Sequence, residues 1–175
     1  MKIIPLLIFA LIMSCCARKK PMSESLLNKP APDFTLLDDN NTARSLAEFK
    51  GKKIVLYFYP KDDTPGCTTE ACSFRDNFAE YGKKNITVLG INYDTPESHK
   101  KFKAKYLLPF ILLSDSTKEV AQKYGAYASI LNILFPKRIT FLIDEQGIII
   151  HILDNVDVKN DAQKIIDIFS KNAPH

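Results

Sequence analysis

The sequence predicts an α/β domain built on a central mixed β-sheet with helices packed against it. Continuous apolar runs of strand length alternate with amphipathic segments of helical length up to residue 124, an order that favours parallel neighbouring strands. Two later apolar runs are separated by four turn-forming residues, which favours an antiparallel hairpin in the same sheet. A length of 175 residues fits one such domain rather than two.

The segment before residue 92 supplies three of the expected strands. The run 54–59 is continuously apolar, as strands covered on both faces are. In the segment that follows, Ala71, Phe74 and Phe78 lie on one helical stripe, and Gly82 is suited to end that helix. We expect, in order, a short strand or hairpin opening at 33–37 with a turn at 38–41, a helical turn at 46–49, a strand at 54–59, a helix at 67–81 and a strand at 86–91.

Beyond residue 92, caps and stops define the helices. Pro96 fits the first turn of a helix at 96–106, and Asp94 or Thr95 is available to cap it. The stretch 126–136 is apolar but has no period, so no element is assigned to it. The remaining expected elements are a short apolar segment at 110–113, a helix from Ser114 or Ser116 to Tyr124 stopped by Gly125, strands at 138–143 and 148–153 joined by a turn at 144–147, and a helix at 161–170.

The first residues form a separate unit with the pattern of an export signal. Lys2 precedes an apolar run at 3–13, which is shorter than the roughly 20 residues that span a bilayer. The run ends at Ser14-Cys15, which resembles the lipobox of bacterial lipoproteins, in which the cysteine is lipidated and becomes the first mature residue. Simple secretion with cleavage near Ala17 and an uncleaved anchor are the alternatives. The expected organisation is a lipoprotein-type signal peptide at 1–14, a tether at 15–28 and a domain at 29–175, with the protein exported, anchored to the membrane through Cys15 and facing the periplasm or the cell exterior.

Charge and ligand-type residues argue against two classes of function. The formal net charge is only +4, and the densest lysine cluster, at 100–105, has the spacing of the solvent-facing side of an amphipathic helix. No nucleic-acid motif accompanies it, so we expect no nucleic-acid partner. The sequence contains no Cys-x-x-Cys, and its three histidines are widely spaced, so a tetrahedral zinc site is not expected.

The segment 60–72 carries the strongest chemical signal in the chain. It follows the predicted strand 54–59 and places Cys67 just after a Pro-Gly turn, where a helix is expected to begin. A thiol there lies near unbonded backbone N–H groups and the positive end of the helix dipole, which favours the nucleophilic thiolate. Cys72 follows five residues later and is placed to resolve an oxidised Cys67. The alternative is a buried structural cysteine, which is common for free cysteines.

The order Pro60, Thr64, Cys67 resembles the active-site signature of peroxiredoxins, and the spacing from Cys67 to Cys72 resembles the subgroup called bacterioferritin comigratory protein or PrxQ. The resemblance covers roughly residues 29–169 and includes the motifs Ala-Pro-Asp-Phe-Thr-Leu at 31–36 and Arg-Ile-Thr-Phe-Leu-Ile-Asp at 138–144. It implies a thioredoxin-like fold, which agrees with the predicted order of strands and helices.

The resemblance also implies roles for four residues around Cys67, each of which has a structural alternative. The Thr64 hydroxyl would donate to the thiolate or to peroxide, or act as an ordinary helix cap. Pro60 would shield the thiolate from water, or simply end the strand. Arg138 would pair with the thiolate and substrate, or be a surface arginine at a strand end. Glu70 would orient an arginine, or stabilise the first turn of the helix.

The implied function is that of a thioredoxin-dependent thiol peroxidase acting in antioxidant defence. Cys67 would reduce hydrogen peroxide or an organic hydroperoxide and become a sulfenic acid, and Cys72 would condense with it to a disulfide. Thioredoxin or a similar dithiol would then reduce the disulfide. No metal, haem or flavin cofactor is implied, and the protein is expected to be a monomer or a weak dimer.

Two other classes of thioredoxin-like protein compete with this interpretation. A thiol–disulfide exchanger usually carries Cys-x-x-Cys and a proline before the Thr-Phe of the later strand, where this chain has Ile139. A Sco-like copper-delivery protein needs Cys-x-x-x-Cys and a histidine ligand, for which His151 is the late candidate. One departure from the PrxQ pattern lies at 130–137, which is apolar and lacks glycine; it leaves open substrate preference and dimer contacts.

Overall fold

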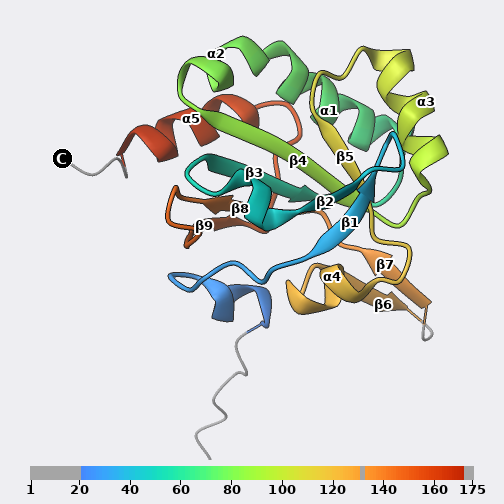
Figure 1. The fold of residues 1–175 in the computed structure, drawn as a ribbon, viewed down its shortest axis with the longest axis horizontal. Helices are drawn as coiled ribbons and strands as arrows, with labels where there is room; N and C mark the ends of the chain where they lie inside the picture. Colours follow the sequence, from blue (N-terminus) through green and yellow to red (C-terminus); the bar gives the residue numbers. More distant parts are fainter. Residues whose placement is uncertain (1–20, 131–132, 172–175) are drawn as a thin grey trace, which may run out of the picture.

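A seven-stranded mixed sheet forms the centre of the molecule in the computed structural model, which describes residues 21–130 and 133–171 (Figure 1). The strand order is β2-β1-β5-β4-β3-β8-β9. Strands β3, β4 and β5 are parallel to one another, and the outer strands pair antiparallel. The bounds are β1 Thr35–Asp38, β2 Ala43–Ser45, β3 Lys53–Phe58, β4 Ile86–Asn92, β5 Ile111–Ser114, β8 Ile139–Ile143 and β9 Ile149–Leu153. The predicted mixed sheet is therefore confirmed.

Helices cover both faces of this sheet. The strand β3 is apolar on both sides, so both faces must be shielded from water. Val55, Tyr57 and Tyr59 face a cluster that includes residues of α1, α2, α3 and α5, whereas Ile54 and Leu56 face a second cluster that includes α4. Figure 1 shows this division. The helices are α1 Pro65–Asp76, α2 Phe78–Lys83, α3 Pro96–Tyr106, α4 Glu119–Lys123 and α5 Asp161–Lys171, with short 3₁₀ helices η1 Ser23–Leu26 and η2 Leu46–Phe49.

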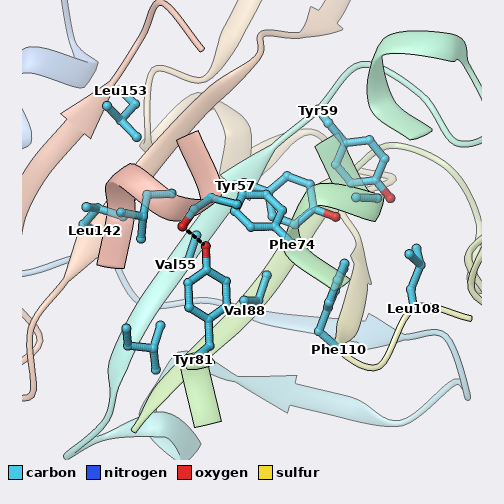
Figure 2. Packing of buried hydrophobic residues seen from close by; sticks show 14 of the residues in the cluster. Val55, Tyr57, Tyr59, Phe74, Tyr81, Val88, Leu108, Phe110, Leu142 and Leu153 are labelled. Carbon is cyan, nitrogen blue, oxygen red and sulfur yellow. Dashed lines mark hydrogen bonds between the residues drawn. The ribbon is translucent and has the colours of Figure 1, made fainter. Parts of the chain in front are cut away.

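Aromatic packing fixes α1 on the sheet. The ring of Tyr57 on β3 lies 4.9 Å from the ring of Phe74 on α1 and 5.2 Å from that of Tyr59. Figure 2 shows Tyr57, Phe74 and Phe110 together in this cluster. Burial of such rings and their tilted or stacked contacts stabilise an interface strongly. The helix that carries Cys67 and Cys72 therefore has a well-defined position on the sheet.

Two predicted helices have different bounds in the structure, in each case where a polar side chain hydrogen-bonds a nearby backbone group. The helix expected at 67–81 is divided into α1 and α2 at Asn77, whose side-chain amide donates to Ser73 O at 2.9 Å, a local bond that competes with the helix. The helix expected to start at Ser114 or Ser116 starts only at Glu119. Asp115 accepts the N–H groups of Val120 and Ala121, and Lys118 has a left-handed backbone with φ 65°.

The apolar stretch left unassigned at 126–136 forms a separate two-stranded hairpin, β6 Tyr127–Ile130 and β7 Ile133–Pro136. Tyr127, Ile133 and Phe135 are exposed, whereas Pro136 is buried. Because apolar side chains occupy both faces of the hairpin, the sequence shows no alternation that would reveal a strand.

Part of the segment expected as a tether, 15–28, contacts the domain. Ser23 is buried in η1, and the Asn28 N–H donates to Ile149 O at 2.8 Å. The expected signal peptide at 1–14, Cys15 and the part of the expected tether up to residue 20 lie outside the described residues. Among the helices that the structure does describe, none has the length and apolar character needed to cross a membrane.

Candidate active site

Cys67 lies in the first turn of α1, at the carboxyl end of the central strand β3. Thr64 caps the helix by position, with an extended backbone, and its carbonyl accepts the Thr68 N–H at 2.8 Å. Pro65, the first helical residue, has no N–H to leave unbonded. The N–H of Cys67 therefore belongs to the set that an α-helix leaves free at its start, and the thiol, which is almost fully buried, lies at the positive end of the helix.

Arg138 reaches this thiol because of strand pairing. It immediately precedes β8, which runs antiparallel to β3 with Phe58 opposite Ile139. This register places the residue before β8 beside the end of β3, where α1 begins. The Arg138 Nη2 atom lies 3.1 Å from Cys67 Sγ, so the guanidinium is in position to stabilise negative charge on the sulfur. The structure thus places Arg138 beside Cys67, at the end of the strand that precedes it.

Glu70 holds the other side of the same guanidinium. Its Oε2 accepts a hydrogen bond from Arg138 Nη1, and its side chain is 3% exposed. Glu70 lies beyond the first turn of α1, so it is not placed to stabilise that turn by its charge. Its contact is with the arginine instead. Within the described residues its second oxygen, Oε1, has no hydrogen-bond partner. Arg138 is thus held between a thiol and a buried carboxyl group.

Burial and charge act in opposite directions in this triad. Burial raises the pKa of Glu70 to about 7, although the neighbouring Arg138 acts to lower it. Burial alone would lower the pKa of Arg138, but Glu70 and Cys67 outweigh it and raise that pKa above its usual value. The arginine therefore stays charged at every physiological pH, while the carboxyl group beside it titrates near neutrality.

The two remaining motif residues lie at the rim. Pro60 is exposed, one residue after the buried Tyr59. The Thr64 hydroxyl donates to Lys61 O at 3.1 Å and makes no side-chain hydrogen bond to its own helix. Neither hydroxyl bond anticipated from sequence, to the sulfur or to the helix N–H groups, is therefore present. Instead the hydroxyl closes the loop 61–64 on itself.

Cys72 lies on α1, five residues after Cys67, and both are free thiols. It is half-buried in a shallow hollow that also includes Thr69, Ser73 and Lys159. On a regular helix, residues five apart have Cα atoms about 8–9 Å apart, whereas a disulfide requires less than about 7 Å. The structure thus has the geometry of the reduced form, in which the two cysteines cannot bond.

The sequence is similar to known proteins over most of its length. Residues 27–152 match the AhpC/TSA family. The chain belongs to this family. A Coxiella burnetii protein named as peroxiredoxin bcp is 45% identical over 145 residues, which cover 80% of this chain and 95% of that relative. Rice chloroplastic peroxiredoxin Q is 46% identical over 125 residues, 71% of this chain. The chain spans only 57% of the length of the rice relative.

Solved structures agree with this assignment to the peroxiredoxin Q/bcp group. Mycobacterium tuberculosis peroxidoxin BcpB matches with a TM-score of 0.79 and 31% identity over 85% of this chain and 98% of its own. A cysteine-to-serine mutant of Xylella fastidiosa PrxQ matches with a TM-score of 0.76 and 31% identity over 86% and 92%. The predicted peroxiredoxin resemblance and thioredoxin-like fold are confirmed.

One polar contact beside the site of this peroxiredoxin was not predicted from the sequence. His99 on α3 is fully buried, and its Nδ1 lies 2.9 Å from Asp62 Oδ2, in the loop before α1. Asp62 belongs to the motif segment, and His99 is 37 positions away. The place of His99 three residues before Phe102 puts it on the inward face of the predicted helix, but nothing in the sequence pairs it with Asp62. In the described part of the chain, no group of three or more His, Cys, Asp or Glu side chains has the arrangement of a metal site.

Proposed function

We propose that this protein is a thiol peroxidase in which Cys67 reduces hydrogen peroxide and organic hydroperoxides. The observation that carries the proposal is the contact of 3.1 Å between Arg138 Nη2 and Cys67 Sγ at the start of α1. A cation and a helix N-terminus then act on one buried sulfur, an arrangement suited to a reactive thiolate. The names of the similar proteins, peroxiredoxin Q and bcp, support the same activity.

The proposed reaction begins with attack of the Cys67 thiolate on one peroxide oxygen. The S–O bond forms as the O–O bond breaks, Cys67 becomes a sulfenic acid, and the departing hydroxide or alkoxide takes a proton to leave as water or alcohol. The charged Arg138 lowers the energy of the negative charge that develops on the departing oxygen. Pro60 and Thr64, at the rim of the site, shape the approach to the buried sulfur.

Cys72 is proposed to resolve the sulfenic acid. Its thiol displaces water from Cys67, forming an intramolecular disulfide. A dithiol such as thioredoxin then attacks this disulfide, leaves as the oxidised partner and restores both thiols. The half-buried position of Cys72 on the surface of α1 supports an encounter with such a reductant. The protein would act as a monomer or a weak dimer.

The test is peroxide consumption by the purified protein with thioredoxin, thioredoxin reductase and NADPH, compared with disulfide exchange on a model disulfide substrate and with copper titration. NADPH oxidation that depends on peroxide supports the peroxidase. Disulfide exchange without peroxide consumption would favour a thioredoxin-like exchanger, and stoichiometric copper binding would favour the Sco-like alternative.

We also propose that the protein is exported and anchored through a lipidated Cys15. Support comes from Lys2, the apolar run at 3–13 and the lipobox-like Ser14-Cys15. The chloroplast location in the name of the rice relative describes that protein. The test is membrane fractionation of cells that express the full chain or Cys15→Ala. The wild type should sediment with membranes and Cys15→Ala should not; a soluble wild type excludes the anchor.

A further inference from the structure

Helix α3 contacts the active-site loop at two successive aspartates. At the first turn of α3, the Ser98 hydroxyl donates to Asp62 Oδ2 at 2.8 Å and His99 Nδ1 lies 2.9 Å from the same oxygen. At its last turn, Lys105 Nζ and the Tyr106 hydroxyl bond the neighbouring Asp63 at 2.6–2.8 Å. Helix α3 lies beside α1 in Figure 1. The loop between β3 and α1 is thus attached to a second helix at both ends of that helix.

Asp62, the buried one of the two aspartates, accepts most of the hydrogen bonds in this attachment. Its Oδ1 accepts from the Tyr59 hydroxyl at 2.6 Å and from Asn92 Nδ2 at 3.0 Å, in addition to the two bonds at Oδ2. Its backbone N–H donates to Asp94 Oδ2 at 2.8 Å. Four donors on one buried carboxylate satisfy it almost completely, which offsets the cost of burying its charge.

These contacts keep the carboxylate ionised. Burial acts to raise the pKa of Asp62, but the hydrogen bonds from His99, Tyr59 and Ser98, with the charge interaction with His99, hold it below the ordinary value. Because an ionised carboxylate only accepts, His99 must carry a proton on Nδ1. Within the described residues, His99 Nε2 is buried and has no partner. The hydrogen bond to Asp62 is therefore the only polar contact of the imidazole that the described residues show.

The attachment also holds a residue with a left-handed backbone. Asp63 has φ 56°, in the left-handed region that aspartate adopts more readily than most residues other than glycine. Such a residue persists when its surroundings fix it, and here Lys105 and Tyr106 hold its side chain. Thr64, the next residue, is the N-cap of α1. The shape of this loop therefore determines where α1 begins, and with it the position of Cys67.

We infer that His99 is a positioning residue for the reaction of Cys67 with peroxide: through its hydrogen bond to Asp62 it fixes the loop 60–64 and so the rim of the peroxide site. This inference rests on the proposed function. The bonds to Asp62 come from β4, α3 and the segments that follow β3 and β4, and none comes from α1. The attachment can therefore stay in place while the start of α1 unwinds, and can guide the helix back when Cys67 is reduced.

The test compares His99→Leu with His99→Asn. The leucine removes the donor, whereas the asparagine amide can replace Nδ1. The measurement is single-turnover oxidation of Cys67 by hydrogen peroxide, followed by rapid quenching with an alkylating reagent. We expect His99→Leu to react about tenfold more slowly or worse, since small displacements of reacting groups have large kinetic effects, and His99→Asn to react at nearly the wild-type rate. Reduction of the oxidised protein by dithiothreitol should be unchanged in both.

The matched control is Ile149→Ala, a fully buried residue in the cluster on the opposite face of the sheet. It should lower thermal stability but leave the oxidation rate unchanged. If His99→Leu does not fold, Ser98→Ala, which removes one bond from Asp62, should give a smaller slowing. The inference is overturned if the variant tested, His99→Leu or Ser98→Ala, oxidises as fast as the wild type, if His99→Asn is as slow as His99→Leu, or if Ile149→Ala is slowed as much. A wild type inert to peroxide would overturn the proposed function as well.

Discussion

Arg138 Nη2 lies 3.1 Å from Cys67 Sγ, although the two residues are 71 positions apart in the sequence. The antiparallel pairing of β3 with β8 creates this contact, and Glu70 completes it by binding the other side of the guanidinium. Arg138 contacts groups from one helix, α1, on both sides. Any movement of the first turns of α1 must therefore disturb the contact with the arginine.

The first prediction concerns the division of work between the two cysteines. Cys67→Ser should abolish peroxide consumption, because the hydroxyl is a far weaker nucleophile than the thiolate. Cys72→Ser should still consume one equivalent of peroxide but should not turn over with a dithiol that reduces only disulfides. The measurement is rapid-quench consumption at equimolar peroxide. If Cys72→Ser consumed no peroxide while Cys67→Ser did, the two roles would be reversed.

The second prediction concerns Arg138. Arg138→Ala should slow the oxidation of Cys67 by about a hundredfold or more, the usual effect of losing one group that stabilises developing negative charge. Because the loss includes stabilisation of the departing oxygen, raising the pH should not restore the full rate. Arg138→Lys is the matched control, because it keeps the charge but not the two-sided contact. Its rate of Cys67 oxidation should lie between those of the wild type and Arg138→Ala. Complete recovery of Arg138→Ala at high pH would mean that the arginine acts only on thiol ionisation.

The third prediction concerns the pH dependence of stability. Burial raises the pKa of Glu70 from 4.5 to about 7 in the folded state, so folding favours its protonated form. This contribution is fully present below about pH 4.5 and is lost as the pH rises through 7. The loss is on the order of 3 kcal/mol of unfolding free energy.

Denaturant unfolding of the wild type and Glu70→Gln between pH 5 and 8 measures this effect. The difference between the two curves isolates Glu70 from other titrating groups. The wild type should lose stability relative to Glu70→Gln as the pH rises. Parallel curves would show that Glu70 titrates at its ordinary value and that Arg138 compensates fully for its burial.

Local signals explain which elements the sequence could predict. Helix α3 has the predicted bounds, because Pro96 occupies its first turn and the Thr95 side chain accepts the Ser98 N–H. The break at Asn77 was missed because an asparagine inside an apolar helical stripe gives no sign of which backbone group it will bond. The hairpin β6–β7 was missed because its apolar residues lie on both faces.

Some residues of the site could be predicted from the sequence and others could not. Cys67 and its place at a helix start follow from the Pro-Gly turn, and Arg138 came from the resemblance of its strand motif. The contact between Asp62 and His99 could not be predicted, because it depends on how α3 packs beside the loop. His99 stands three residues before Phe102 and seven before Tyr106, on the inward face of the helix, so its burial follows from the helical spacing. No pattern within the sequence of either segment identifies Asp62 as its partner.

The last prediction is that the start of α1 unwinds in each catalytic cycle. Cys67 and Cys72 lie on one continuous helix, and a disulfide between them requires their Cα atoms to approach from about 8–9 Å to less than about 7 Å. The bond therefore cannot form while the intervening turn is helical. Thr68 and Thr69 are mediocre helix formers, and Gly66 adds backbone freedom, so the unwinding costs little. Unwinding also removes Glu70 from Arg138, which releases the arginine from its second contact.

Amide hydrogen exchange on the reduced and oxidised forms tests this. The oxidised protein should lose protection from about Cys67 to Cys72, whereas α3 should keep its protection in both forms. Cys72→Ser treated with one equivalent of peroxide is the control: it reaches the sulfenic acid but cannot close the disulfide, so it should retain most of its helix protection. Equal protection of 68–74 in reduced and oxidised wild type would refute the unwinding, because a disulfide to Cys72 is incompatible with an intact helix, and would point to a partner other than Cys72.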